Sequence, residues 1–482
     1  MPGTAVEKSD VVIVGGGLAG LACAVGLCGS GLKLTVLERS ANLGGRAQSW
    51  VDTTTGDAID IGPHVFANTY RNMLRLLRRF GTHGCIAWHR DKLITLLDRG
   101  KAIPMRASSL PAPLHLAPSF VHALSRTTLA STDLRSNVPV SRLALTLDDH
   151  SLLALDEVPA VDFLRRQGVT PRFIDWFWAS MSMAIANLPL EQCSAATLMR
   201  TYQFLIGNRK LCFGSATLSL GELYAPQAKK MIEASGGTVV TNAEVTRLLH
   251  TDGTARGVEL RDGTRIDAAY CVSAVPPASL HAILPDAWRA QRPFTQLVEF
   301  QPDPYISVYL WFERKLTRER FWTRLWAPGN LNYDFYDLSN IRESWGTRTS
   351  VIASNIIYSH RAHHLTDEEI VRVTVQELAE FAPEAARTRI RHAVVHRIPM
   401  AIPCPYPGTE TKRPDTRTPM RNLLLAGDWV NTGLPASMES AVRAGWLAAE
   451  QIWRGIGVPK SLALEVERFP GVAGLIRRVA LH

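Results

Sequence analysis

The chain of 482 residues contains few cysteines, and they form no pattern that would build a site or a framework. Their number is odd, and no two stand in the C-x-x-C spacing that is typical of zinc ligands or redox pairs. The sequence therefore predicts neither a disulfide scaffold nor a metal site. The cysteines are Cys23, Cys28, Cys85, Cys193, Cys212, Cys271 and Cys404.

Long hydrophobic runs are also missing. No stretch of about 18 or more uncharged apolar residues occurs, so the sequence predicts no membrane-spanning helix. Residues 1–10 lack the cationic, apolar and small-residue succession of a signal peptide. We therefore expect a cytoplasmic location.

Acidic residues are in the minority, with 44 Asp and Glu against 53 Lys and Arg, which gives a net charge of +9. This balance favours an anionic partner, either nucleic acid or an anionic bilayer, or simply a basic soluble surface. No nucleic-acid-binding motif occurs, so we expect no nucleic acid partner. No Ser/His/Asp order, metal cluster or Cys/His pair stands out either, and the catalytic side chains stay unknown at this stage.

What the sequence does contain is a complete βαβ pattern near its start. Val11 to Val14 form a short apolar run, three glycines follow, and Leu18 to Leu27 continue in small and apolar residues with helical spacing. The turn matches G-x-G-x-x-G, whose glycines allow a tight turn, close approach of a pyrophosphate and close helix-to-strand contact. The helix N-terminus then faces the phosphates. The dinucleotide contacts predicted here are Gly15, Gly17, Leu18, Ala19 and Gly20.

A second strand, Leu32 to Leu37, ends at Glu38, whose carboxylate can accept hydrogen bonds from the ribose hydroxyls of an adenosine. Arg39 follows, and then Leu43-Gly44-Gly45-Arg46. This E-R-x-x-x-L-G-G-R run resembles the FAD-binding fingerprint of the flavin amine oxidase and carotenoid desaturase superfamily. The resemblance implies FAD as the cofactor, with Glu38, Arg39, Gly45 and Arg46 among its contacts. Arg46 would supply a bidentate cation for the pyrophosphate, and the alternative is a solvated surface arginine.

A second fingerprint lies near the C-terminus. Residues 422–429 read NLLLAGDW and residues 434–442 read LPASMESAV, which predicts a strand, an acid at its end, a loop and a helix. Asp428 after Gly427 suits a hydrogen bond to the ribityl chain. The helix that begins near Ser437 and Met438 could direct its first N–H groups at the N1 and O2 region of the flavin.

Five further contacts, in three segments, rest on resemblance. The segment GPHVF-x-x-x-Y-x-N, with Gly62, Pro63 and His64, resembles plant-type phytoene desaturases and hydroxysqualene dehydroxylases, in which this loop lies beside the flavin ring. His64 could equally be a structural histidine. Val245 matches the segment whose backbone meets the adenine, and Ala274 follows a buried strand that stops near the dinucleotide.

These patterns predict an α/β fold. We expect a discontinuous Rossmann-like FAD-binding domain, a mixed α+β substrate domain and a helical subdomain. The predicted ranges are residues 1–107, 220–290 and 416–458 for the FAD-binding domain, 108–219 for a helical, substrate- or membrane-facing subdomain, 291–415 for a β-sheet substrate domain, and 459–482 for a C-terminal tail.

The resemblance covers nearly the whole chain and is most specific at the two fingerprints, at GPHVF, at WFERKL and at LPASMESAVRAG. It implies an FAD-dependent oxidoreductase that acts on a long linear isoprenoid by hydride transfer with flavin N5. Phytoene-type desaturation and dehydroxylation of hydroxysqualene to squalene both remain open. A flavin amine oxidase acting on a polar amine and a non-catalytic escort protein with the FAD fold are the alternatives.

Two segments could lie on a membrane surface. Residues 108–125 are punctuated by proline and apolar, and residues 469–482 form a short apolar and basic tail. Each could instead pack on the protein. We expect a peripheral membrane contact through one of them, while the sequence does not determine the oligomeric state.

Overall fold

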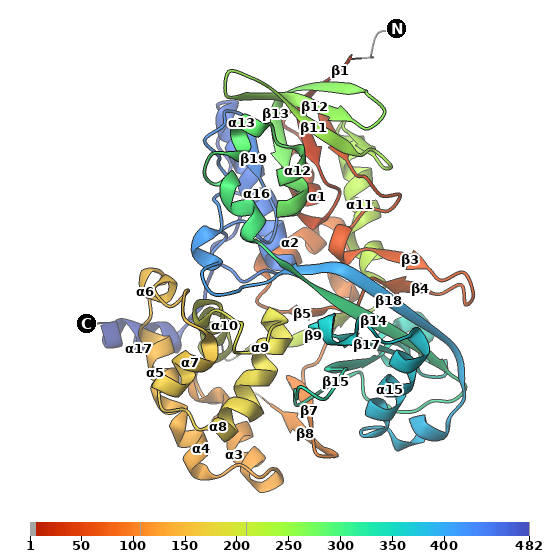
Figure 1. The fold of residues 1–482 in the computed structure, drawn as a ribbon, viewed down its shortest axis with the longest axis vertical. Coiled ribbons are helices and arrows are strands. Elements are labelled where there is room, and N and C mark those ends of the chain that lie inside the picture. The colour runs from red at the N-terminus through yellow and green to blue at the C-terminus, as the bar shows by residue number, and fades with distance from the viewer. Residues whose placement is uncertain (1–5, 107, 209, 482) are drawn as a thin grey trace.

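The structure is a computed structural model that describes residues 6–106, 108–208 and 210–481. Figure 1 shows three parts: a unit built on a first β-sheet, a helical subdomain, and a unit built on a second sheet. Long strands of the second sheet, β14 (Pro302–Phe312) and β18 (Ile390–Pro403), extend from the lower right toward the first unit. The predicted α/β class with a Rossmann-like unit is confirmed.

The first sheet forms around a parallel core. Its strands run in the order β10 (Thr238–Val240), β2 (Leu34–Leu37), β1 (Val6–Val14), β13 (Arg265–Ser273), β12 (Thr254–Leu260) and β11 (Val245–Thr251), and β19 (Leu423–Leu425) also pairs with β13. The neighbours β10, β2, β1, β13 and β19 are parallel, whereas β11 and β12 are antiparallel. Three segments of the chain far apart in sequence therefore share one sheet.

Helices pack on this first sheet and on one another. Every residue of α1 is buried, because the helix lies against both α16 and α11, which suits its small and apolar sequence. The helices of this unit are α1 (Leu18–Leu27), α2 (Arg71–Phe80), α11 (Leu220–Ala234), α12 (Pro277–Ile283), α13 (Asp286–Arg289) and α16 (Met438–Gly455).

The second sheet has the strand order β18, β14, β17 (Val351–Ile356), β16 (Asp334–Asp337), β15 (Phe321–Arg324), β7 (Ile94–Asp98) and β8 (Lys101–Met105). It is antiparallel apart from the β15–β7 pair. Helices α14 (Leu338–Ile341) and α15 (Asp367–Ala379) accompany it. Two small sheets join β3 (Ser49–Val51) to β4 (Ala58–Asp60), and β5 (Val65–Ala67) to β9 (Phe213–Ala216) and β6 (Ile86–Trp88).

The middle of the chain is helical, as predicted, and its aromatic and methionine side chains form a buried core rather than a surface. Trp178, Trp176 and Met181 all belong to that core. Its helices are α3 (Ala117–Arg126), α4 (Ser131–Ser136), α5 (Val138–Thr146), α6 (Asp149–Leu153), α7 (Ala160–Arg166), α8 (Pro171–Phe173), α9 (Ala179–Ala186) and α10 (Ala195–Gly207).

One segment lies outside the part to which the sequence assigned it, and the C-terminal tail packs on two parts of the molecule. The hairpin of β7 and β8 falls within the range expected for the FAD-binding domain, but it completes the second sheet. The C-terminal tail crosses α2, where Leu464 N donates to Asn72, and ends in α17 (Val472–Leu481), which packs on α5. The tail therefore joins the first unit to the helical subdomain.

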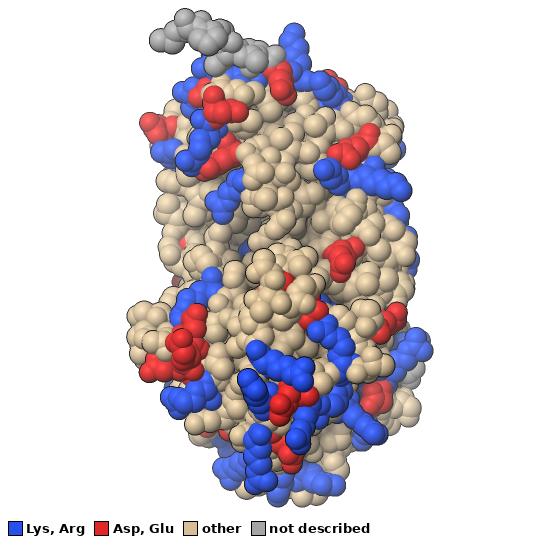
Figure 2. All heavy atoms as spheres, turned by 90° about the vertical axis from the view of Figure 1, so that its right-hand side faces the viewer, with Lys and Arg blue, Asp and Glu red and all other residues tan. Residues whose placement is uncertain are grey.

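The surface charge is unevenly distributed. On the face in Figure 2, Lys and Arg gather over the lower part, while much of the middle is uncharged and hollowed. Within the described ranges no helix combines the length and apolar character needed to cross a membrane.

Candidate functional site

The backbone of the first glycine loop lies so close to neighbouring backbone that its glycines leave no room for a side chain. Gly15 has a φ of +110°, a backbone conformation that favours glycine, and a Cβ there would lie 2.8 Å from the carbonyl oxygen of Ala274. A Cβ at Gly20 would overlap the carbonyl oxygen of Gly15. The structure thus brings Gly15, Gly20 and Ala274 together near the ends of β1 and β13, while their contacts with a dinucleotide stay predictions.

The second glycine segment lies directly on the first. Gly44 N donates to Gly16 O at 2.9 Å, and Gly17 and Gly44 form a parallel bridge. A Cβ at Gly17 would meet nothing nearer than the backbone of Gly44 and Gly45 at 3.9 Å. The two glycine segments therefore meet backbone to backbone, with no side chain between them. They lie beside the first turn of α1, where the amides of Leu18 and Ala19 have no partners within the helix.

Glu38 lies at the carboxyl end of β2 and is almost fully buried. Its Oε2 accepts a hydrogen bond from Gly16 N at 2.8 Å, and its Oε1 accepts from Ser40 N and Ser40 Oγ, both at 2.9 Å. A carboxylate offers about four acceptor sites, so it keeps capacity for a ribose hydroxyl. Its contact with ribose stays a prediction.

Arg39 and Val245 flank this acid on the surface side. Arg39 is exposed and lies near Glu244, the residue before Val245. Ala243 N donates to Glu38 O at 2.9 Å, so the segment that leads into β11 adjoins the end of β2. This arrangement suits the expected backbone contact of Val245, while nothing in it directs Arg39 toward the glycine loops.

The structure pairs two residues that the sequence assigned to different parts of the cofactor. Arg46 Nη2 lies 2.5 Å from Asp428 Oδ1, and Arg46 Nη1 donates to Ala401 O at 3.3 Å. Asp428 is buried, whereas the Arg46 side chain is 31% exposed. The two fingerprints therefore meet in one ion pair, and Arg46 is not the free surface arginine that was considered.

The second fingerprint has the expected order of elements. Gly427 follows β19 with a φ of +146°, and a Cβ there would lie 2.6 Å from Trp429 Nε1. Ser437 caps α16, because its Oγ accepts from Ser440 N at 3.2 Å, and Met438 is the first helical residue. The segment between β19 and α16, which we call the Asp428 turn, therefore carries Asp428 and leads directly into the first amides of α16.

The segment from Gly62 to His64 behaves differently from the expectation in one respect. A Cβ at Gly62 would overlap the hydroxyl of Tyr305 and lie 2.7 Å from Ser307 Oγ. Its missing side chain therefore permits contact with β14, and a flavin contact does not follow from it. Pro63 O accepts from Asn355 Nδ2 at 3.4 Å, which also ties this loop to the second sheet.

His64 is held in one protonation state. Burial lowers its pKa, with the charge of Arg46 acting in the same direction and the carbonyl of Gly62 and Asp60 opposing. Its Nδ1 lies 2.7 Å from Gly62 O, and since a carbonyl only accepts, Nδ1 carries the proton. The Nε2 of the neutral ring is then an acceptor.

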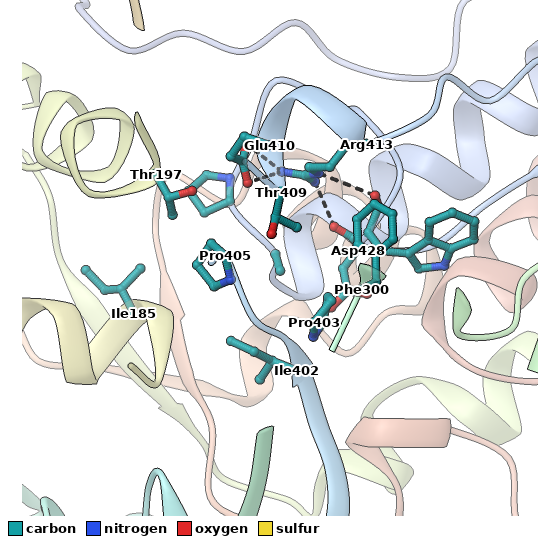
Figure 3. A pocket seen from close by; sticks show the side chains of 13 residues that line it. Ile185, Thr197, Phe300, Ile402, Pro403, Pro405, Thr409, Glu410, Arg413 and Asp428 are labelled. Atoms are coloured by element: carbon teal, nitrogen blue, oxygen red, sulfur yellow. Dashed lines mark hydrogen bonds and ion pairs between the residues drawn. The ribbon is translucent and has the colours of Figure 1, made fainter. Parts of the chain in front are cut away.

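A cavity adjoins the Asp428 turn where all three parts of the molecule meet (Figure 3). Ile185 of α9, Phe300, Ile402 of β18 and Pro435 give it a largely apolar lining. Its polar side chains are Thr197, Thr409, Glu410, Arg413 and Asp428. No group of three or more His, Cys, Asp or Glu in the described part of the chain could hold a metal ion.

The sequence reasoning missed two residues that support this site. Tyr224 Oη donates to Ala47 O at 2.8 Å and approaches Gly44 O at 3.1 Å, so α11 braces the second glycine segment. Arg413 contacts the turn that carries Asp428. Tyr224 belongs to the LGELY segment (residues 220–224), but that segment did not indicate a contact with the glycines. For Arg413, only the E-x-x-R spacing from Glu410 indicated a local ion pair.

The residues present fit FAD. Two glycine backbones leave a cradle free of side chains, a helix N-terminus faces that cradle, and acids stand at the ends of β2 and β19. The individual contacts proposed for the site residues stay predictions.

Comparisons with known proteins agree with this geometry. The family described as flavin containing amine oxidoreductase matches residues 18–453. The 15-cis-phytoene desaturase of Synechococcus elongatus is 27% identical over 462 residues, which cover 92% of this chain and 95% of that protein. The probable zeta-carotene desaturase of the same organism is 24% identical over 474 residues, covering 91% and 98%. The structure of putrescine oxidase bound to putrescine is similar in fold, with a TM-score of 0.70 at 18% identity over 93% of this chain and all of that one.

Proposed function

Because the chain belongs to the flavin-containing amine oxidoreductase family, and is therefore an FAD-dependent oxidoreductase, we propose that its substrate is a long linear isoprenoid. The observation that carries the proposal is the similarity to phytoene and zeta-carotene desaturases over more than nine tenths of the chain. When bound, FAD supplies the redox chemistry by exchanging a hydride at N5 with an allylic carbon.

The protein's own residues would bind and orient the cofactor and the substrate. The glycine cradle, Glu38 and the start of α16 would hold the cofactor, and Arg46 would be shared between Asp428 and the pyrophosphate. Ile185, Phe300 and Ile402 present apolar surface beside the same turn, which suits a hydrocarbon chain and excludes water. A polar amine would find no free carboxylate in that lining, because Glu410 is paired with arginines and Asp428 with Arg46.

Two reactions fit this arrangement. Desaturation of a phytoene-type chain is supported by the named relatives and by GPHVF and WFERKL. Dehydroxylation of hydroxysqualene is the second candidate, because LGELY (residues 220–224) and LAGDW-x-x-TG-x-PA around Asp428 resemble the dehydroxylases. Tyr224 of LGELY also braces the glycine cradle.

Anaerobic spectroscopy of the holoenzyme tests the proposal. Phytoene-type substrate in liposomes should bleach the oxidised flavin, while hydroxysqualene should reoxidise chemically reduced enzyme if dehydroxylation is the reaction. Bleaching by an amine alone would return the protein to the amine oxidases, and a flavin inert to all three would favour a non-catalytic escort. Ile402→Glu, which places a charge in the apolar lining, should slow the isoprenoid reaction while keeping FAD, and Val51→Glu at an exposed site is the control.

We also propose that the enzyme works as a peripheral protein on the cytoplasmic membrane surface. On α17, Val472, Leu475, Ile476 and Val479 repeat at helical spacing and are exposed, with Val479 79% exposed. Leu114 and Val121, in and beside α3, are also exposed. The net charge of +9 also suits anionic lipid.

Flotation with anionic liposomes separates these segments. Leu475→Glu with Val479→Glu should reduce the bound fraction, and raised salt should reduce it further. Val121→Glu tests α3 in the same way, and Val51→Glu on the first unit is the matched control. Equal flotation of all four proteins would exclude both helices as the contact.

A further inference from the structure

Arg413 is almost fully buried, and all five of its N–H groups have acceptors. Four of these acceptors are main-chain carbonyls of the turn between β19 and α16. Nη2 donates to Asp428 O at 2.7 Å and to Val430 O at 2.8 Å. Nη1 donates to Leu434 O at 2.7 Å, and Nε donates to Trp429 O at 3.4 Å. One guanidinium therefore holds four carbonyl groups of the turn, from residue 428 to residue 434, by hydrogen bonds.

The fifth N–H group is directed at Glu410, which lies on the other side of Arg413 in Figure 3. Both carboxylate oxygens of Glu410 lie 3.2 Å from Arg413 Nη1, and Oε2 also pairs with Arg200 of α10. Burial acts to raise the pKa of Glu410, but Arg413 and Arg200 together hold it below its usual range, so the group is ionised. The pair Glu410–Arg200 thus links the turn to the helical subdomain.

Other contacts each fix a single point of the turn: Arg46 pairs with Asp428, Arg468 Nη2 donates to Gly433 O at 3.0 Å, and Arg443 Nε donates to Thr432 O at 3.2 Å. The main-chain bonds of the turn include Val430 N to Gly427 O at 3.2 Å and Asn431 N to Pro414 O at 2.8 Å. Carbonyls at the end of a strand point in different directions, and a planar guanidinium with fixed donor directions can satisfy several of them at once. A lysine has three donors on one atom and could not span them.

We propose that Arg413 is a positioning residue for FAD: it fixes the main chain that presents Asp428 and the N-terminus of α16, and Glu410 with Arg200 anchors it to α10. This inference rests on FAD lying against the Asp428 turn, as the proposed function requires. Arg413 itself does not touch the cofactor in this account.

The test follows release of FAD from the full-length holoenzyme on dilution, through the rise in flavin fluorescence. Arg413→Lys keeps the charge beside Glu410 but loses most of the carbonyl contacts, so FAD should leave at least ten-fold faster and the visible flavin bands should shift. Release and bands identical to those of the wild-type protein would overturn the proposal. A wild-type protein that carries no FAD would instead contradict the family's cofactor.

Two other variants separate positioning from general damage. Arg324→Lys changes another buried arginine, paired with Glu377 and Glu380 in the second sheet, and should leave FAD release within two-fold. Glu410→Gln removes the charge that anchors Arg413 but leaves Arg413 its four carbonyl acceptors, so FAD should leave at least about three-fold faster than from the wild-type protein, but more slowly than from Arg413→Lys. If Arg413→Lys does not fold, Glu410→Gln still tests the proposal. FAD release from Arg324→Lys at least ten-fold faster than from the wild-type protein, or release from Glu410→Gln no faster than from the wild-type protein, would overturn the proposal.

Discussion

The two large sheets of this molecule are held together differently. In the first sheet, Val11, Val12 and Ile13 of the central strand are fully buried among other apolar residues. In the second sheet, the strands bury polar side chains, among them Ser307, Arg324, Asp334, Asp337, Ser354 and Asn355. The first sheet depends on burial of surface, which tolerates small losses, and the second depends on particular donors and acceptors, whose removal leaves a partner unmet.

Glu377 of α15 is the best example of the second kind. Its carboxylate accepts from Leu331 N, from Asn332 N and from Asn332 Nδ2, at 2.7 to 2.9 Å, and lies 3.0 Å from Arg324 Nη1. The carboxylate is buried, so every one of these contacts replaces water. A single substitution here should cost more than a comparable one in the first sheet.

The largest effect is expected for Arg324→Met. The variant leaves the buried carboxylate of Glu377 without its cation, and such a loss typically lowers the free energy of unfolding by about 3–5 kcal/mol. Equilibrium denaturation by urea measures it. Arg247→Met, which removes an exposed pair with Glu259, should cost no more than about 1 kcal/mol. Equal costs would refute the distinction between the sheets.

Gly20→Ala should be next. The new methyl group would overlap Gly15 O and lie 3.2 Å from Ala274 Cβ, so the loop must shift, at a cost of about 1–3 kcal/mol. Retention of FAD after gel filtration should fall with it. Gly84→Ala, where nothing lies within 4 Å, is the control. A more stable Gly20→Ala protein would mean that helix propensity outweighs the overlap.

The third prediction concerns pH and a buried acid at the start of the second sheet. Burial raises the pKa of Asp303 to about 7, opposed by the N–H of Tyr358, and His360 lies beside the carboxylate. Between about pH 4 and pH 7 the folded state keeps a proton that the unfolded state has lost. Stability should therefore fall as pH rises through this window, by up to about 1.4 kcal/mol per pH unit.

Asp303→Asn should flatten that dependence, and thermal unfolding across the pH range would show it. Asp57 provides the opposite sign, because Arg348 and Trp311 overcome its burial and hold its pKa below the usual range. The stability from Asp57 is present above about pH 4 and is lost in acid. A slope in Asp303→Asn equal to the wild-type slope would assign the dependence to other groups.

The smallest effect is expected where the sheets should agree. Ile13→Val in the first sheet and Ile352→Val in the second each delete one methylene from a fully buried side chain. Each should cost about 0.5–1.5 kcal/mol. If the two costs differed by more than about 1 kcal/mol, the apolar cores of the two sheets would differ as well as their polar contacts.

The same contrast explains what could be predicted from the sequence. The βαβ unit around Gly15 and Glu38 and the turn at Asp428 follow from local order, because strand, glycines and acid are adjacent in the chain. The hairpin of residues 94–105 was also predictable, but its partner β15 was not, since Trp322 pairs with Thr95 across a long stretch of chain.

Contacts between distant side chains were out of reach for the same reason. The pairing of Arg46 with Asp428 joins residues 382 positions apart, and no periodicity links them. The flavin contact of Gly62 stays a prediction, but its close contact with Tyr305 could not be predicted, because Tyr305 lies on a strand of another sheet. Local pattern identifies elements, whereas the choice of partner depends on the packed whole.

The position of β19 has a consequence for how the protein is made. Strand β1 pairs with β13, and β13 acquires β19 only when Leu423–Leu425 has left the ribosome. Until then the nascent chain carries the first glycine loop and Glu38 but neither Asp428 nor α16, the helix against which α1 packs. Synthesis must therefore have passed α16 before the flavin can be enclosed, and retained FAD distinguishes chains that include this helix from those that stopped before it.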